Sequence, residues 1–200
     1  SKYIAIKLEW EDLTSDASLY RVQDFQDAAA IQFSIDGTMD FHGMGSRDHP
    51  TDIWFWKSEW QMQKNSDTDT DIELAYVNRV TDSDVESYPD EFDDTAFLGG
   101  RDAGNINSKQ ERISSVENVS AVGPETVTTH PEKSQNVNGS GIWDGKKWRV
   151  VFIREMKPGS DKEVKFKEGG IVPVGFAVWN GSENDRNGQK MVSTWYQLEL

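Results

Sequence analysis

Cysteine is absent from this sequence of 200 residues. Its absence excludes disulfides, zinc–thiolate sites, cysteine-ligated iron–sulfur clusters and covalent attachment of a c-type haem, which needs a Cys-x-x-Cys-His motif. Long apolar runs are absent too. No stretch of about 18 apolar residues occurs, so no segment is predicted to span a membrane.

Basic residues are few. Lys and Arg number 21 against 35 Asp and Glu, which gives a formal net charge of −14. Nucleic acids and anionic membrane surfaces are therefore excluded as expected partners, because both are bound through basic patches. An acidic surface instead attracts a basic partner, such as a small basic electron carrier, by electrostatic steering.

The sequence does contain many segments in which apolar residues alternate with polar ones, which is the pattern of half-buried β-strands. Turn dipeptides such as Asp36-Gly37, Asp144-Gly145 and Asn180-Gly181 separate them. We predict a mainly β fold, an antiparallel β-sandwich with long irregular connections and few short helices. The alternating sets are Ile4, Ile6, Leu8 and Trp10; Ile31, Phe33 and Ile35; Ile72, Leu74 and Tyr76; Trp148, Val150 and Phe152; Val172, Val174, Phe176 and Val178; and, in one closing strand, Val192, Thr194, Tyr196, Leu198 and Leu200.

The middle of the chain differs from its two ends. Residues 65–94 are strongly acidic, and residues 99–140 are polar with little periodicity. So long an irregular stretch in a compact domain usually has a function or is disordered. We interpret residues 1–200 as a single domain in which 65–140 form a long polar excursion that covers one end of the sandwich.

Candidate ligands for a metal are sparse. The three histidines are His42, His49 and His130, and none has metal-ligand spacing to another ligand. The acidic run from Asp67 to Glu73 lacks the glycine and the final glutamate of a calcium loop. No nucleophile elbow, phosphate loop or paired-carboxylate site is recognisable, so the sequence predicts no catalytic residues.

Tryptophan is abundant, with eight residues, most of them attached to predicted strands. Most tryptophans are expected in the core, and a subset could wall a pocket for a flat ligand. If that subset were exposed, it would suit the stacking of sugar rings, so a carbohydrate-binding module is the alternative function.

Residues 43–57, which read GMGSRDHPTDIWFWK, set Met44 between two glycines ahead of an aromatic strand. Together with several other segments they resemble the haem-binding gamma subunit of the type II dimethyl sulfoxide reductase family, whose members serve ethylbenzene dehydrogenase, dimethyl sulfide dehydrogenase and selenate, chlorate or nitrate reductases. The resemblance covers most of the chain and is weakest over 65–94. The other segments are YIAIKLEW (3–10), DAAAIQF (27–33), AGN (103–105), VENVSAVGPETVT (116–128), VNGSGIWDGKKWRVVFIREM (137–156) and VPVGFAVWNGSENDRNGQKMVSTWYQLEL (172–200).

The resemblance implies one noncovalent b-type haem whose iron is held between a methionine and a lysine. On this sequence these are Met44, in the Met-Gly step, and Lys190, ahead of the final strand. Lys57 is the reserve candidate for the lysine, and His42 is the reserve if Met44 is not a ligand. Only a neutral amine binds iron, and deprotonating a lysine with a pKa of about 10.4 at pH 7 requires about 4.6 kcal/mol.

The resemblance further implies an electron-transfer subunit that is not catalytic by itself. It would form a heterotrimer with an iron–sulfur beta subunit and an alpha subunit that carries a molybdenum cofactor. An external carrier such as a soluble cytochrome c would exchange electrons with the haem. The expected location is the periplasm or the outer face of the cytoplasmic membrane.

Overall fold

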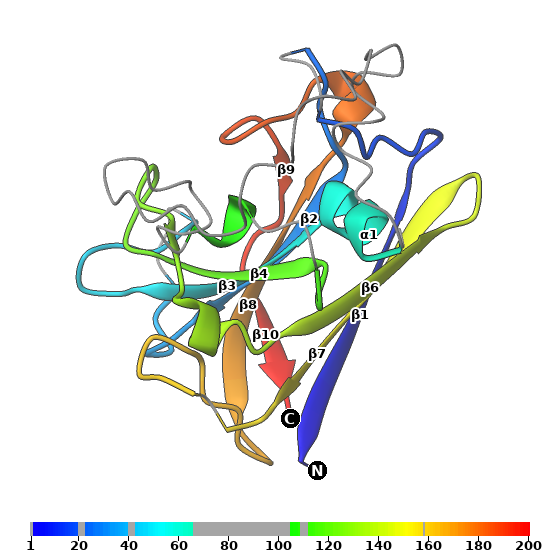
Figure 1. Ribbon diagram of the computed structural model, residues 1–200. Coiled ribbons are helices and arrows are strands. Elements are labelled where there is room, and N and C mark those ends of the chain that lie inside the picture. Colours follow the sequence, from blue (N-terminus) through cyan, green and yellow to red (C-terminus); the bar gives the residue numbers. More distant parts are fainter. Residues whose placement is uncertain (1, 20–22, 40–42, 66–104, 109–111, 158) are drawn as a thin grey trace, which may run out of the picture.

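The structure is a computed structural model, which describes residues 2–19, 23–39, 43–65, 105–108, 112–157 and 159–200 (Figure 1). It is built mainly from antiparallel strands, which confirms the predicted fold class. Within the described residues, the strands are β1 (Tyr3–Glu11), β2 (Ala28–Ser34), β3 (Thr51–Lys57), β4 (Val116–Ala121), β5 (Thr128–Thr129), β6 (Asn138–Trp143), β7 (Lys147–Glu155), β8 (Ile171–Trp179), β9 (Met191–Val192) and β10 (Tyr196–Glu199). The helices there are α1 (Ser58–Asn65) and three 3₁₀ turns, η2 (Ile106–Ser108), η3 (Glu132–Ser134) and η4 (Gly181–Glu183).

The strands form two sheets. The first, sheet A, has the order β1-β7-β6, and the second, sheet B, has the order β10-β8-β2-β3-β4-β5, with β9 also paired to β8. The predicted turn at Asp144-Gly145 joins β6 to β7. Its Asp144 Oδ1 accepts the N–H groups of Lys146 and Lys147, and Gly145 has a φ of +94°, which glycine adopts without steric penalty.

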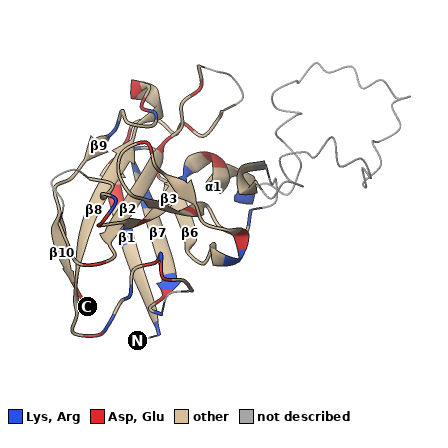
Figure 2. Cartoon of the chain, turned by 90° about the vertical axis from the view of Figure 1, so that its left-hand side faces the viewer, with Lys and Arg blue, Asp and Glu red and all other residues tan. Residues whose placement is uncertain are grey.

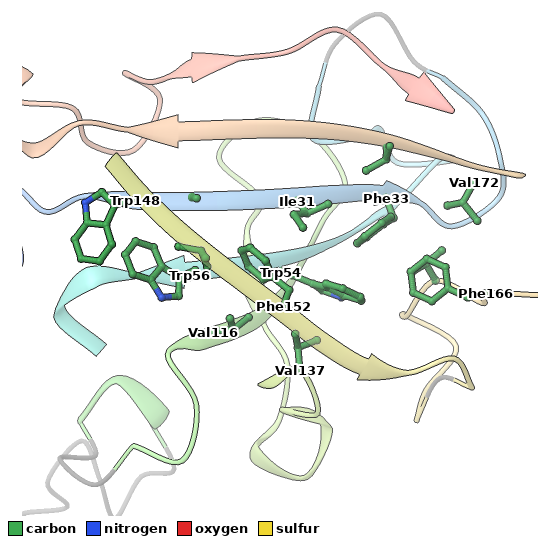
Figure 3. Close-up of a cluster of buried hydrophobic side chains, with 14 residues drawn as sticks. Ile31, Phe33, Trp54, Trp56, Val116, Val137, Trp148, Phe152, Phe166 and Val172 are labelled. Carbon is green, nitrogen blue, oxygen red and sulfur yellow. The ribbon is translucent and has the colours of Figure 1, made fainter. Parts of the chain in front are cut away.

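A large apolar core lies between the two sheets (Figure 3). The alternation in each strand supplies it, because successive side chains point to opposite faces. Four of its aromatic residues are 0% exposed: Trp54, Trp56, Phe33 and Phe152. Their rings meet largely edge to face, as between Phe33 and Trp54 with centroids 4.8 Å apart.

One buried ion pair crosses this core from sheet to sheet. Arg154 on β7 and Asp52 on β3 are 1% and 0% exposed, and Arg154 Nη1 lies 3.2 Å from Asp52 Oδ2. Glu163, equally buried, accepts a second contact from the same guanidinium at 3.5 Å. Burial raises the pKa of Asp52 to about 6, although Arg154 opposes that shift.

The two sheets differ in how deeply their outer faces are buried. In β1 and β7 the residues that point away from the core are largely exposed. In β2 and β3 both faces are mostly buried. β2 and β8 also carry no charged residue, and both are tan along their length in Figure 2. The outer face of sheet B is therefore a second apolar surface and not the solvent side of a two-layer sandwich.

Two expectations about the elements need correction. The polar stretch 99–140 contains β4, a buried interior strand of sheet B, and the beginning of β6. The predicted closing strand is divided into two short strands, β9 and β10, because Ser193 interrupts it. The Ser193 hydroxyl, in place of a backbone carbonyl, accepts the N–H of Phe176 at 2.9 Å. The predicted strand at Ile72–Tyr76 and the acidic run from Asp67 to Glu73 lie outside the described residues.

Candidate functional site

The outer face of sheet B is the candidate site, and the strand register defines it. Ala30 on β2 lies between Ala177 on β8 and Phe55 on β3. Ile53 in turn faces Val119 on β4. The apolar cluster on this face consists of Ala30, Ile53, Val119 and Ala121, with Met44, Phe55, Ala177 and Trp179 packed against it.

Small side chains occupy the middle of this face and aromatic rings border it. The alanines at 28, 30 and 177 project little from the sheet, so the rings of Phe55 and Trp179 meet above β2 with centroids 5.0 Å apart. A flat ligand on this face would meet both rings. Aromatic and apolar side chains of this kind line sites for large organic cofactors.

Met44 lies on this face in an unusual backbone conformation. Its φ is +73°, a left-handed value uncommon for any residue with a side chain. Two hydrogen bonds hold its main chain. Gln32 Oε1 accepts the N–H of Met44 at 2.9 Å, and the N–H of Gly123 donates to the Met44 carbonyl at 3.0 Å.

Gly45 explains part of the sequence pattern around Met44. Its φ is +72°, and a Cβ at this position would lie 2.4 Å from the carbonyl oxygen of His49. In the structure Gly45 serves the tight turn that presents Met44 to the face.

Lys190 lies near the same face, beside the ring of Trp179. It precedes β9, and its Nζ lies 5.2 Å from the ring centroid of Trp179 and donates to the carbonyl of Asn187 at 3.1 Å. Among the described residues it has no carboxylate partner. Burial lowers the pKa of its ammonium, because a charged amine loses hydration there.

The expected alternation of one closing strand from Val192 to Leu200 does not hold. Val192 pairs with Ala177 on the outer face of sheet B, whereas Tyr196 pairs with Val174, which points into the core. The interruption at Ser193 shifts the phase between them. Lys190 reaches the outer face through the segment before β9, not as part of a continuous strand.

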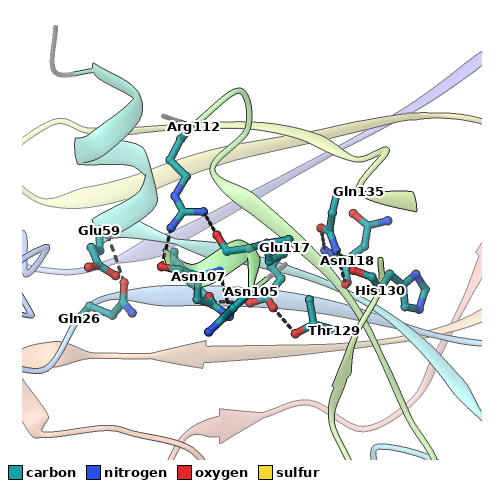
Figure 4. A network of polar contacts seen from close by, with 12 residues as sticks. Gln26, Glu59, Asn105, Asn107, Arg112, Glu117, Asn118, Thr129, His130 and Gln135 are labelled. Carbon is teal, nitrogen blue, oxygen red and sulfur yellow. Dashed lines mark hydrogen bonds and ion pairs between the residues drawn. The ribbon is translucent and has the colours of Figure 1, made fainter. Parts of the chain in front are cut away.

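Lys57, the reserve lysine, also ends on this face, but it is already paired. Its Nζ forms a buried ion pair with Glu117 on β4, donates to Asn107 at 3.2 Å and lies 4.3 Å from the ring centroid of Trp60. Glu117 also accepts a hydrogen bond from Thr129 at 2.6 Å (Figure 4). A neutral Lys57 would leave a buried carboxylate without its counter-ion, which is strongly unfavourable.

The histidines offer no alternative metal centre in the described part of the chain. His49 Nδ1 lies 2.6 Å from Asp36 Oδ2, which holds the pKa of that carboxyl down at about 2. His130 is buried, and burial lowers its pKa. No group of three or more His, Asp or Glu side chains there could hold a metal ion. His42 lies outside the described residues.

The tryptophans do not form an exposed platform. Trp54, Trp56, Trp60 and Trp148 are buried. The other four of the eight are partly buried, and none belongs to the exposed class. A carbohydrate-binding module that stacks sugars on exposed tryptophans therefore lacks its main feature here.

In the structure Met44 packs against the apolar cluster on the outer face of sheet B, and Lys190 lies beside Trp179, which packs against the same cluster. Sequence reasoning placed these two residues and the aromatic strand near one site. It missed Gln32, Glu117 and the alanines of β2. Gln32 is a polar residue inside the mainly apolar strand AAAIQFS, and that polar interruption was the available signal.

Comparisons with known proteins agree with the sequence resemblance. The model of a family described as ethylbenzene dehydrogenase matches residues 1–191. A respiratory nitrate reductase heme subunit of Haloferax mediterranei is 25% identical over 194 residues, which cover 96% of this chain and 50% of that protein.

Two further relatives are gamma subunits. The chlorate reductase subunit gamma of Ideonella dechloratans is 21% identical over 199 residues, covering 98% of this chain and 59% of that protein. The dimethylsulfide dehydrogenase subunit gamma of Rhodovulum sulfidophilum is 26% identical over 200 residues, covering 96% and 54%. The chain thus spans between 50% and 59% of the length of these three curated relatives. Within its described residues, no helix has the length and apolar character to cross a membrane.

Proposed function

Because the chain belongs to the ethylbenzene dehydrogenase family, we propose that it binds one b-type haem and transfers electrons as a non-catalytic subunit of an oxidoreductase complex. The observation that carries this proposal is the outer face of sheet B, where Met44 and Lys190 approach one apolar surface. The absence of cysteine excludes thioether attachment of the haem to this sequence, and the proposed binding is noncovalent.

The residues of this face fit the group. A methionine thioether and a neutral amine are both suitable axial donors, and the thioether is a soft ligand that haem iron accepts. The small residues Ala28, Ala30 and Ala177 leave the sheet flat, and Phe55 and Trp179 provide aromatic walls. A haem bound here supplies one-electron redox chemistry at its iron.

Lys190 is the better lysine on physical grounds. The ligand must lose its proton, and burial already lowers the pKa of Lys190 while no carboxylate among the described residues holds that proton in place. Lys57 instead forms a buried ion pair with Glu117, which it would have to leave in order to bind iron. Metal binding is therefore coupled to deprotonation of Lys190 and weakens as the pH falls.

The partners are proposed from the relatives, two of which are named as gamma subunits of larger enzymes. The chain would assemble with an iron–sulfur beta subunit and a molybdenum-containing alpha subunit, in the periplasm or at the outer face of the cytoplasmic membrane. A soluble cytochrome c or similar carrier would exchange electrons with the haem. The net charge of −14 favours a basic carrier, whose encounter it would accelerate.

The proposal is tested on the full-length protein purified from haem-replete cells. We expect Soret and alpha bands, one haem per chain, and complete removal of the haem by acid–acetone extraction, with a c-type cytochrome treated in parallel as the control. A colourless protein from such cells, or haem that stays with the polypeptide, would show that the proposal is wrong.

A further inference from the structure

Gln32 lies in the middle of the candidate site and places a polar side chain where its neighbours are apolar. It is on β2, opposite Gly175 on β8 and Ile53 on β3. Its side chain extends over Gly175, since a Cβ there would lie 2.8 Å from Nε2 and 3.2 Å from Cγ of Gln32. Any larger residue at 175 would displace the glutamine.

The amide oxygen of this side chain holds the backbone of Met44. Gln32 Oε1 accepts the Met44 N–H at 2.9 Å, and Gly43 packs on the same amide group, with its Cβ position 3.4 Å from Nε2. Gln32 thus stands between the floor of the face and the Gly43–Gly45 turn. It connects a rigid interior strand to the turn that carries Met44.

The hydrogen bond between Gln32 and Met44 fixes a residue whose backbone conformation is strained. A left-handed conformation of a residue other than glycine persists when its surroundings fix it, and such residues cluster at functional sites. Met44 has this conformation, with φ +73°, and it is followed by Gly45 at +72°. The N–H of Gly123 donates to its carbonyl, and its own N–H donates to Gln32, so both polar groups of the Met44 main chain are fixed.

We infer that Gln32 is the positioning residue for Met44: it holds the methionine backbone so that the thioether faces the haem. The inference rests on the proposed function, because it presumes that Met44 is a haem ligand. Gln32 itself does not touch the iron. It acts through Met44, and Gly175 provides the space in which it lies.

The test compares Gln32→Leu, which keeps the approximate volume but removes the acceptor, with Gln32→Glu, which keeps an acceptor oxygen. In the ferric haem-loaded protein, Gln32→Leu should lose most of the far-red methionine-to-iron charge-transfer band, and haem affinity should fall about tenfold, the equivalent of about 1.4 kcal/mol. Gln32→Glu should retain the band. In the haem-free protein, the Met44 amide should exchange with solvent faster in Gln32→Leu than in the unaltered chain.

Gln26→Leu is the matched control. Gln26 Oε1 also accepts a backbone N–H, that of Glu59 at 3.1 Å, at the start of α1 and away from Met44 (Figure 4). This variant should leave the band and the Met44 amide unchanged. If Gln32→Leu keeps the band and slow exchange while the unaltered protein shows methionine ligation, the inference is wrong and the proposed function stands. If the unaltered protein binds no haem, both are overturned.

Discussion

The methionines at 44 and 191 form a matched pair for testing the axial ligand. Met44 packs against the apolar cluster on the outer face of sheet B, whereas Met191 is 74% exposed. Met44→Ala should open a coordination position, change the visible spectrum and lower the reduction potential by on the order of 100 mV, because a thioether ligand raises it. Met191→Ala should change neither. An unchanged spectrum and potential in Met44→Ala would exclude Met44 as a ligand.

Asp27 gives a prediction about stability and pH. This fully buried carboxylate accepts the N–H groups of Asp16 and Gly181 and of the Trp148 indole, yet burial raises its pKa to about 6. Between an unfolded pKa of about 3.9 and the folded value, the native state binds more protons, so this group's contribution to stability falls as the pH rises.

Asp27→Asn places an NH₂ group against one of these donors and should destabilise the protein by about 1–3 kcal/mol. Because the amide of the variant does not titrate, the difference in the free energy of unfolding between the unaltered protein and the Asp27→Asn variant should become smaller from pH 4 to pH 7. Urea unfolding at both pH values measures it, with the exposed Asp161→Asn as control. A gap that widens with pH would show that the three donors outweigh burial and lower the pKa of Asp27.

At the scale of elements, the outer face of sheet B depends on small residues in β2. Ala30 is 5% exposed in the middle of that face, and Ala5 on β1 is an alanine that points to solvent. Ala30→Leu should raise a branched side chain from the floor of the site and lower haem affinity at least about tenfold, with a stability loss of about 1–3 kcal/mol. Haem titration of the two variants checks this. Equal affinity in Ala30→Leu and Ala5→Leu would place the haem elsewhere.

The strands were predictable where one face is apolar and the other polar, as in β1 and β7. β4, which reads VENVSA, was not, because its polar residues are buried and paired. Glu117 meets Lys57, and Asn118 binds Asn136 and the backbone of Val137. Alternation cannot identify a strand whose polar residues find partners only in the folded chain.

The candidate site also has parts that the sequence could suggest and parts that only the structure shows. Met44 and Lys190 were proposed from the family resemblance. The physical distinction between Lys190 and Lys57 needed the structure, since only there does Glu117 meet Lys57. Gln32 could not be assigned a role either. The hydrogen bond between Gln32 and Met44 joins residues that are 12 positions apart in the sequence. The sequence does not show which backbone N–H will donate to the Gln32 side chain.

At the scale of the whole molecule, Arg154 joins the two sheets through buried ion pairs in the described part of the chain. Arg154→Met would leave Asp52 and Glu163 buried without their counter-ion, so we expect a loss of about 3–5 kcal/mol in the free energy of unfolding. Arg149→Met on the same strand breaks exposed pairs with Glu9 and Asp144 and should leave the free energy of unfolding nearly unchanged. Denaturant unfolding compares them. Equal losses would contradict the role of Arg154 between the sheets.

The central claim is that a haem lies on the outer face of sheet B between Met44 and Lys190. An acid titration of the visible spectrum of the haem-loaded protein tests it most directly, because the amine of Lys190 gains a proton and leaves the iron while a thioether has none to gain. We predict one acid transition in the unaltered protein and in Lys57→Met, and its loss in Lys190→Met, which should show two methionine ligands or no haem. Persistence of the transition in Lys190→Met together with its loss in Lys57→Met would identify Lys57 as the ligand and contradict this account.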